Sequence, residues 1–283
     1  MRRVCLLSLL LALVVGGCQP GQEEINFTPR PKTYSTVASL SPGSSEIVGS
    51  LAYAAKLVGR TAACNFPPNV KNAPVVAQVK PDYEKLKAAS PGLVIYETSL
   101  YSEQDIAQIK ALGADTFQFK AKTIKDFTKE IREFGKLMAV ETEASNYADK
   151  IENEEKAALA AAPSPPPTIA LIMPGSGGEH YIAGTQSFQA DVVRASGGKP
   201  VGPAQDRYVP INAEALIKLN PDIIITAGNP TPLVDDPRLA SLPAIAKVKV
   251  RGINIDLATR MGFRVDQEIN RLARAIADVQ EGK

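Results

Sequence analysis

Short apolar runs alternate along the chain with longer stretches in which apolar side chains recur every three or four positions. Runs rich in β-branched and aliphatic residues occur at 36–40, 57–61, 92–96, 115–119, 168–172, 222–226 and 248–256. Helical periodicity is found between them, at 44–55, 102–112, 188–196 and 265–279 and around Glu84 and Glu214. Apolar strands separated by helices are typical of parallel sheets that are covered on both faces. The pattern therefore predicts an α/β fold.

Two segments of the chain carry nearly the same pattern. The first is EKLKAASPGLVIY at 84–96, and the second is EALIKLNPDIIIT at 214–226. The strands TVASL and TIALI, which precede Pro42 and Pro174, repeat in the same way. The two leading Glu residues are 130 positions apart, and the two strands are 132 positions apart. These nearly equal offsets indicate a duplicated unit and predict two Rossmann-like lobes with mostly parallel sheets.

The segment between the two predicted lobes is helical by pattern. Its apolar residues recur at steps of three and four, at Ile124, Phe127, Ile131, Phe134 and Met138. Val140 marks a predicted break, and Thr142 is a candidate N-cap for the helix that follows. The proline-rich run 163–167 ends that helix. The predicted organisation is an N-terminal lobe at 34–122 and a C-terminal lobe at 163–283, joined by a single long α-helix among the linking helices of 123–162.

The first residues are typical of a bacterial lipoprotein signal peptide, predicted at 1–17. Arg2 and Arg3 precede an apolar stretch that is too short to span a membrane, and two Gly residues stand directly before Cys18. This arrangement matches a lipobox, in which the Cys is diacylated and becomes the mature N-terminus. The alternative is an ordinary secretion signal with an unrelated Cys nearby. We expect an extracytoplasmic protein anchored through lipid on Cys18, with 18–33 as a flexible tether.

Charge and cysteine content narrow the class of protein. The sequence has 32 Lys and Arg against 30 Asp and Glu, and removal of 1–17 takes away two Arg, so that the mature chain is balanced. A nucleic-acid-binding surface needs an excess of basic residues and is therefore not expected. Cys64 is the one thiol that follows Cys18, so no disulfide forms within the body. We expect Cys64 to be a small buried residue, with a ligand contact beside Asn65 and Phe66 as the alternative.

The body of the chain resembles the helical-backbone (class III) periplasmic binding proteins that deliver cobalamin, ferric siderophores or haem to ABC importers. The resemblance covers residues 34–280 and is carried by VASLSPGSSEIVGSLAYAAKLVGRTAACNFPP, YEKLKAASPGLVIYE, EALIKLNPDIIIT and RMGFRVDQEINRLARAI. It implies a substrate-binding lipoprotein that captures a metal chelate between its lobes and delivers it to a permease dimer with a cytoplasmic ATPase. Glu84 and Glu214 match the surface Glu residues that dock against the permease. The alternative for both is an ordinary solvated helix charge.

The chelate is expected at loops that follow the carboxyl ends of strands, where open α/β sheets place their binding sites. The candidate contacts are Ser41, Pro42, Asn65, Phe66, Tyr96 and Tyr101 from the first lobe and His180, Tyr181, Gln186, Asn229, Arg260, Met261 and Phe263 from the second. Aromatic rings suit a corrin, porphyrin or catecholate face, and Arg260 suits a propionate or an anionic siderophore. Arg264 begins the last predicted helix and is interpreted as structural. The lack of Trp weighs against cobalamin, and the choice among the three chelates stays open.

His180 is the one His in the sequence. A cage for a bare zinc or manganese ion needs several His and carboxylate ligands, so metal is expected only as part of the chelate, with no intrinsic cofactor. His180 is either an axial ligand to haem iron or a polar residue of a Gly-rich loop. An enzyme is not expected, because no G-x-S-x-G elbow occurs and one His leaves little scope for a Ser-His-Asp triad. A tethered sensor or scavenger of the same fold is the alternative function.

Overall fold

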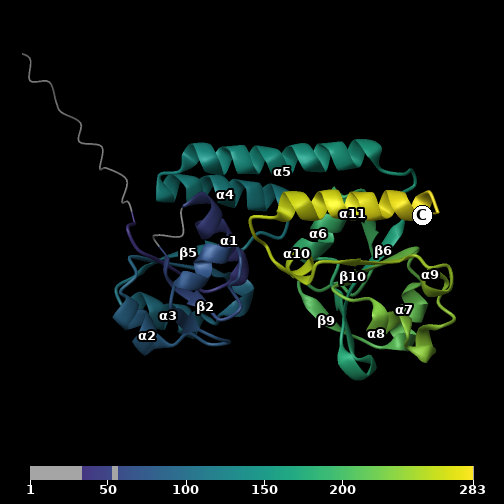
Figure 1. Ribbon diagram of the computed structural model, residues 1–283, viewed down its shortest axis with the longest axis horizontal. Coiled ribbons are helices and arrows are strands. Elements are labelled where there is room, and N and C mark those ends of the chain that lie inside the picture. Colours follow the sequence, from purple (N-terminus) through teal and green to yellow (C-terminus); the bar gives the residue numbers. More distant parts are fainter. Residues whose placement is uncertain (1–33, 53–56, 283) are drawn as a thin grey trace, which may run out of the picture. The chain divides into compact units, whose positions relative to one another are not determined.

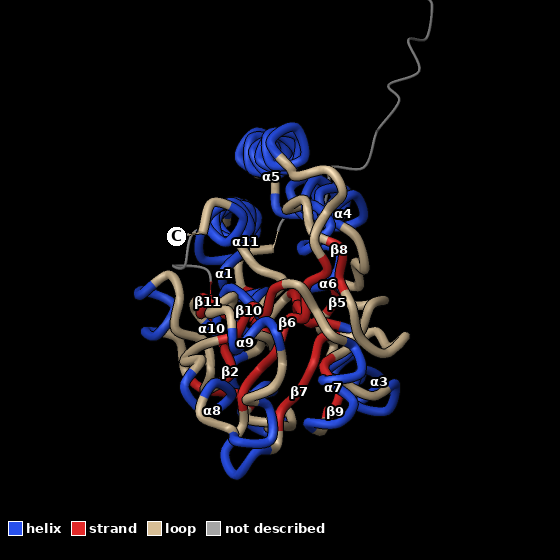
Figure 2. Tube along the Cα trace, turned by 90° about the vertical axis from the view of Figure 1, so that its right-hand side faces the viewer, coloured by secondary structure: helices blue, strands red, loops and turns tan. Residues whose placement is uncertain are grey.

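The computed structural model describes residues 34–52 and 57–282, which belong to one compact unit, Lys32–Lys283. The predicted signal peptide, the lipidation site Cys18 and the predicted tether lie outside the described residues. Within the compact unit, two α/β lobes share one layer of helices, α4 (Ile124–Met138), α5 (Glu141–Ala161) and α11 (Val265–Gln280), on the same side of both sheets (Figure 1, Figure 2).

The N-terminal lobe is built on a parallel sheet of five strands in the order β3-β2-β1-β4-β5. Its strands are β1 (Val37–Ser39), β2 (Leu57–Thr61), β3 (Val75–Ala77), β4 (Leu93–Glu97) and β5 (Asp115–Phe119). Its helices are α1 (Pro42–Leu51), α2 (Tyr83–Ala89) and α3 (Glu103–Ala111), with short 3-10 helices at Pro68–Asn72 and Thr98–Leu100. Every strand predicted for this lobe is confirmed, and the parallel arrangement is that of the predicted α/β fold.

The C-terminal lobe has a mixed sheet in the order β11-β10-β6-β7-β9, with β8 also paired to β6. Its strands are β6 (Thr168–Pro174), β7 (His180–Ala183), β8 (Lys199–Pro200), β9 (Tyr208–Ile211), β10 (Ile223–Ala227) and β11 (Val250–Ile253). Its helices before α11 are α6 (Phe188–Ala195), α7 (Ala213–Leu219), α8 (Thr231–Val234), α9 (Pro243–Ala246) and α10 (Ile255–Thr259), and 3-10 helices lie at Ser176–Gly178 and Pro237–Leu239. The antiparallel pairs β6–β7 and β7–β9 were not predicted, because these short strands lack a long apolar run.

The duplication inferred from the sequence is visible in the strand registers. In the first lobe Val37 pairs with Leu93, and in the second Ile169 pairs with Ile223. The helices α2 and α7 have the same length of seven residues, and each ends at a residue in the left-handed conformation, Ser90 with φ 45° and Asn220 with φ 43°. The strand registers and the helix ends thus repeat from one lobe to the other. Glu84 and Glu214 therefore occupy equivalent positions, in the first turns of α2 and α7.

Consecutive residues of the central strands point into different hydrophobic clusters, because side chains alternate across a sheet. Val37, Leu93 and Ile95 belong to the large cluster that also contains the apolar faces of α4, α5 and α11. Ala38 and Val94 lie on the opposite face, in a smaller cluster beneath α2 and α3. In the second lobe the opposite face is covered by α7, α8 and α9. Both faces of each sheet are therefore buried at its central strands, which explains why β4 and β10 consist mainly of apolar residues.

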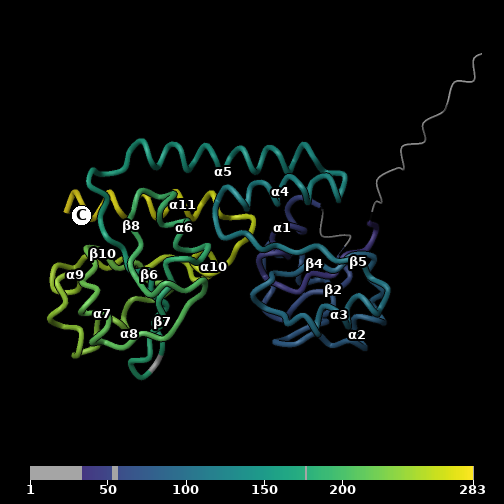
Figure 3. The backbone as a smooth tube through the Cα atoms, turned by 180° about the vertical axis from the view of Figure 1, so that it is seen from behind, coloured from purple at the N-terminus to yellow at the C-terminus, as the bar shows by residue number. Residues whose placement is uncertain are grey.

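The link between the lobes consists of two helices. As predicted, the helical pattern breaks near Val140, where α4 ends at Met138 and Ala139 takes a left-handed φ of 55°. The prediction that Thr142 is an N-cap was wrong, because α5 already begins at Glu141 and its cap position is Val140, which makes no side-chain cap. The helix α5 runs past both lobes, beside α4 at one end and α11 at the other (Figure 3).

Candidate functional site

A cavity of about 370 Å³ lies between the lobes, where parallel strands of the N-terminal sheet end. The strand β4 ends at Glu97 and β5 ends at Phe119, so the residues that follow them form one wall. The opposite wall comes from the first turn of α6, from Asp206 and from Met261. The lining residues are Glu97, Thr98, Ser99, Gln118, Phe119, Lys120, Ala121, Lys122, Phe188, Gln189, Asp206 and Met261. Buried Phe119, Ala121, Phe188 and Met261 are its apolar part, and the other side chains surround it with charges, amides and hydroxyls.

Glu97 is the half-buried acidic residue of the cavity wall. Burial raises the pKa of Glu97 from the ordinary 4.5 to about 7, and the negative charge of Glu46 raises it further. A hydrogen bond from Ser41 and the positive charge of Arg260 lower the pKa and partly offset the rise. The carboxyl lies against the first turn of α1, since a Cβ added to Gly43 would stand 2.8 Å from Glu97 Oε1. Near neutral pH this carboxyl therefore exchanges a proton and can act as hydrogen-bond donor or acceptor.

Lys122 and Asp206 connect the lobes across one side of the cavity. Lys122 Nζ donates to Asp206 Oδ2 at 3.1 Å. This hydrogen bond holds the pKa of Asp206 below its usual range. The two side chains stay 63% and 44% exposed, so water competes for both charges.

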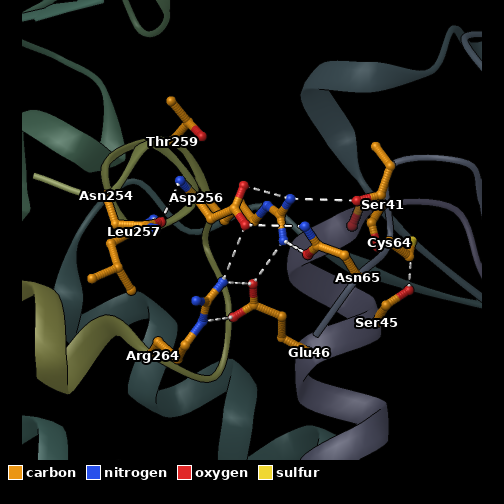
Figure 4. A network of polar contacts seen from close by, with 12 residues as sticks. Ser41, Ser45, Glu46, Cys64, Asn65, Asn254, Asp256, Leu257, Thr259 and Arg264 are labelled. Carbon is orange, nitrogen blue, oxygen red and sulfur yellow. Dashed lines mark hydrogen bonds and ion pairs between the residues drawn. The ribbon is translucent and has the colours of Figure 1, made fainter. Parts of the chain in front are cut away.

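A second and buried connection between the lobes is centred on Glu46 of α1. Arg260 Nη1 donates to Glu46 Oε1 at 3.1 Å, and Arg264 Nε donates to Glu46 Oε2 at 3.0 Å. Arg260 Nη1 also reaches Asn65 Oδ1 at 2.6 Å, and Arg260 Nη2 lies 2.7 Å from Asp256 Oδ1. Figure 4 shows Glu46, Asn65, Asp256 and Arg264 of this network meeting between α1 and the segment that leads into α11. Because the Glu46 side chain is only 1% exposed, water does not solvate its charge, and the two guanidinium groups compensate it instead.

Two glycines allow the lobes to approach at this network. A Cβ on Gly43 would stand 2.4 Å from the Met261 carbonyl oxygen, and a Cβ on Gly262 would stand 2.6 Å from Glu46 Oε2. Tyr147 of α5 fixes the same turn, since its hydroxyl donates to the Gly262 carbonyl at 3.0 Å. The lobe spacing that sets the width of the cavity thus depends on this contact.

The carboxylates Glu84 and Glu214 lie outside the cavity. Both are exposed, and both occupy the second position of their helices after the side-chain caps Asp82 and Asn212. The helices α2 and α7 lie on the side of the lobes that is remote from α5 (Figure 1).

Comparison with known proteins identifies the family to which this architecture belongs. The sequence model of the periplasmic binding protein family matches residues 37–256. The chain belongs to this family. It is 25% identical over 264 residues to the uncharacterized ABC transporter substrate-binding lipoprotein YvrC of Bacillus subtilis strain 168, with 90% of this chain and 82% of YvrC covered.

Solved structures share the fold of this periplasmic binding protein. The periplasmic haem-binding protein BhuT, in complex with two haems, superposes with a TM-score of 0.75 at 20% identity and covers 87% of this chain and 99% of its own. The periplasmic vitamin B12 binding protein BtuF of Vibrio cholerae superposes with a TM-score of 0.77 at 17% identity and covers 88% and 98%. Two lobes on one helical layer are therefore the common architecture of the group, and these neighbours are binding proteins.

The candidate ligand contacts lie at several places in the periplasmic binding protein. Met261 lines the interlobe cavity. Asn65, Phe66 and Arg260 belong to the Glu46 network, where the Arg264 guanidinium lies 4.3 Å from the centre of the Phe66 ring. Ser41 is the buried N-cap of α1, directly before Pro42.

The aromatic candidates act mainly on neighbouring groups. Tyr96 donates to Gln118 Oε1 at 3.0 Å and so orients an amide of the cavity wall. Tyr101 donates to the Leu40 carbonyl at 2.6 Å, and Phe263 stacks on Tyr147 with ring centroids 4.2 Å apart.

The candidates Gln186 and Asn229 are exposed loop residues, and Asn229 Oδ1 accepts a hydrogen bond from the Thr231 amide.

His180 and Tyr181 lie at a different cavity, of about 510 Å³, together with Arg238. The His180 ring is 1% exposed, and its Nε2 is 3.6 Å from Asp236 Oδ2. Arg238 binds the same carboxylate and holds the pKa of Asp236 down at about 2. The structure thus separates the one His of the chain from the space between the lobes.

Several residues of the cavity wall were missed by sequence reasoning, namely Glu97, Gln118, Lys120, Lys122, Gln189 and Asp206. The rule used to choose candidates, that sites follow the carboxyl ends of strands, also applies to 97–99 and 118–122. Cys64 is buried as predicted, at 1% exposure, and its sulfur accepts a hydrogen bond from Ser45.

Proposed function

We propose that this protein is the substrate-binding component of an ABC importer, which captures a metal chelate between its lobes and delivers it to a permease dimer. The observation that carries the proposal is the interlobe cavity, whose apolar part is surrounded by hydrogen-bonding and charged side chains. The metal enters only as part of the chelate, and the protein holds no cofactor of its own. The printed names of the relatives support this role: YvrC is a substrate-binding lipoprotein, and BhuT and BtuF bind haem and vitamin B12.

The same proposal includes an extracytoplasmic location and a lipid anchor on Cys18. The lipobox pattern supports the anchor, and YvrC is described as a lipoprotein. Among the described residues, no helix has the length and apolar character needed to cross a membrane. Binding rather than catalysis is the proposed activity, because the family and the structural neighbours are binding proteins.

Thermal melting of the chain from residue 19 onward tests the proposal. Cobalamin, haemin and several ferric siderophores are added separately, and tyrosine fluorescence follows binding. A ligand present at 100 times its dissociation constant stabilises the folded state by about 2.7 kcal/mol. For a chain of this size we expect the melting temperature to rise by roughly 5–10 °C with one chelate class. No shift with any chelate would contradict the proposal.

A further inference from the structure

The two charged connections between the lobes differ in burial, and this difference decides which one can change partner. In the Glu46 network, the side chains of Glu46, Arg260 and Arg264 are 1%, 11% and 13% exposed. Removing a partner from such a group leaves an uncompensated buried charge, which is strongly unfavourable. Lys122 and Asp206 are 63% and 44% exposed, and an exposed ion pair contributes little net stability. The Lys122 pair is therefore the one that a ligand can open.

Lys122 is also in the right place to meet a ligand. Its side chain lines the interlobe cavity beside Lys120, and Asp206 lines the same cavity. Across the cavity, Phe188 and Gln189 are the first residues of α6, so the positive end of that helix dipole faces the same space. The Lys122 ammonium group and a helix N-terminus thus face a space that is also lined by Lys120 and in which Asp206 already forms an ion pair with Lys122.

We propose that Lys122 anchors an anionic oxygen group of the bound chelate and that this group replaces Asp206 as its partner when the ligand enters. The inference rests on the proposed function and deepens it, because it selects chelates with carboxylate or catecholate oxygens at their edge over chelates whose edge carries only amides. Arg260, which the sequence suggested for this role, keeps its bonds to Glu46, Asn65 and Asp256. Lys122 is thereby a specificity-determining residue.

The exchange predicts different effects of substituting Lys122 and Asp206 on the affinity for the chelate. Lys122→Gln removes the anchor, so the affinity for an anionic chelate should fall by about tenfold, which corresponds to the loss of one charged hydrogen bond. Asp206→Asn removes a competitor for Lys122, so the affinity should rise or stay at the wild-type value. If the pair only held the lobes together, both variants would lose the same connection and both would bind more weakly.

Equilibrium titration followed by tyrosine fluorescence tests the inference with three probes: haemin, a ferric tricatecholate and cyanocobalamin, whose corrin edge carries amides and has no free carboxylate or catecholate. Wild type, Lys122→Gln and Asp206→Asn are compared with Lys129→Gln as the control, since Lys129 is an exposed lysine of α4 that pairs with Glu133. Raising the salt concentration from 50 to 300 mM should weaken wild-type binding of an anionic probe and should affect Lys122→Gln less.

Equal weakening by Lys122→Gln and Asp206→Asn would overturn the inference and leave a structural contact. It would also be overturned, with the proposed function intact, if cyanocobalamin alone were bound. Absence of binding by every probe, and by siderophores of other classes, would overturn the proposed function itself and the inference with it. Both substituted side chains are exposed, so the variants are expected to melt within a few degrees of the wild type.

Discussion

At the residue scale, Glu97 connects the cavity with the contact between the lobes. Its carboxyl lines the cavity, lies against Gly43 of α1 and is influenced by both Glu46 and Arg260. A half-buried acid whose pKa stands near 7 is charged to a different degree at each end of the physiological range. Its protonation state therefore changes the charge of the cavity and the stability of the folded protein together.

The raised pKa gives a prediction for stability. Between pH 4.5 and about 7 the folded protein holds a proton on Glu97 that the unfolded chain has lost, so the contribution of this group to stability falls as pH rises through this window. In Glu97→Gln this dependence is absent, and the fall in unfolding free energy from pH 5 to pH 8 should be smaller than in wild type by about 1–3 kcal/mol. Urea denaturation at both pH values measures the difference.

The control for this measurement is Glu133→Gln, which changes an exposed acid of α4. It should follow the wild-type pH dependence. If Glu97→Gln did the same, the carboxyl would be shown to titrate at its ordinary value in the folded protein.

At the element scale, the helices α4 and α5 form an antiparallel pair whose close approach depends on one glycine. A Cβ on Gly135 would stand 2.4 Å from the Ala144 Cβ, so the Ala144 methyl group packs directly on the backbone of α4 at Gly135. On the outer side Arg132 binds both Asp149 and Glu152 of α5, at 2.6 Å and 2.8 Å. Together with α11, this helix pair forms the helical layer that packs against both lobes.

We expect Gly135→Ala to destabilise the protein, because the added methyl group must push the helices apart. Overpacking of a buried contact costs about 1–3 kcal/mol, and the better helix propensity of Ala offsets up to about 1 kcal/mol of this. The double variant Gly135→Ala/Ala144→Gly removes the clash and should be more stable than the two single changes predict together. A double-mutant cycle from urea denaturation measures this coupling, and purely additive effects would contradict the proposed contact.

At the scale of the whole molecule, the duplication produces two equivalent carboxylates on two lobes. Glu84 and Glu214 occupy the same helix position after equivalent strand registers, and both are exposed. We propose that both dock on a permease dimer, whose two equivalent surfaces suit one Glu per lobe by symmetry. In such docking, charge complementarity sets the register and speeds the encounter.

Reversing the charges of Glu84 and Glu214 tests whether the protein functions in transport or as a sensor or scavenger. Glu84→Arg and Glu214→Arg should each lower uptake of the labelled chelate by roughly tenfold, and the double variant should lower it further, because repulsion replaces attraction at the permease. Chelate affinity of the purified protein should not change. Glu143→Arg on α5 is the control, as an exposed Glu on the other side of the molecule. Normal uptake by the double variant would favour the sensor or scavenger.

Apolar periodicity was sufficient to predict the α/β class, the duplication, most helices and strands and the break at Val140, because it reflects which face of each element is buried. The contacts between side chains, in contrast, depend on the folded arrangement. Arg260 and Glu46 are 214 positions apart, and Lys122 and Asp206 are 84 apart, so their contacts depend on how the lobes lie against each other. The antiparallel strands β7 and β9 likewise needed the whole lobe, since short strands acquire stability from their neighbours and not from local pattern.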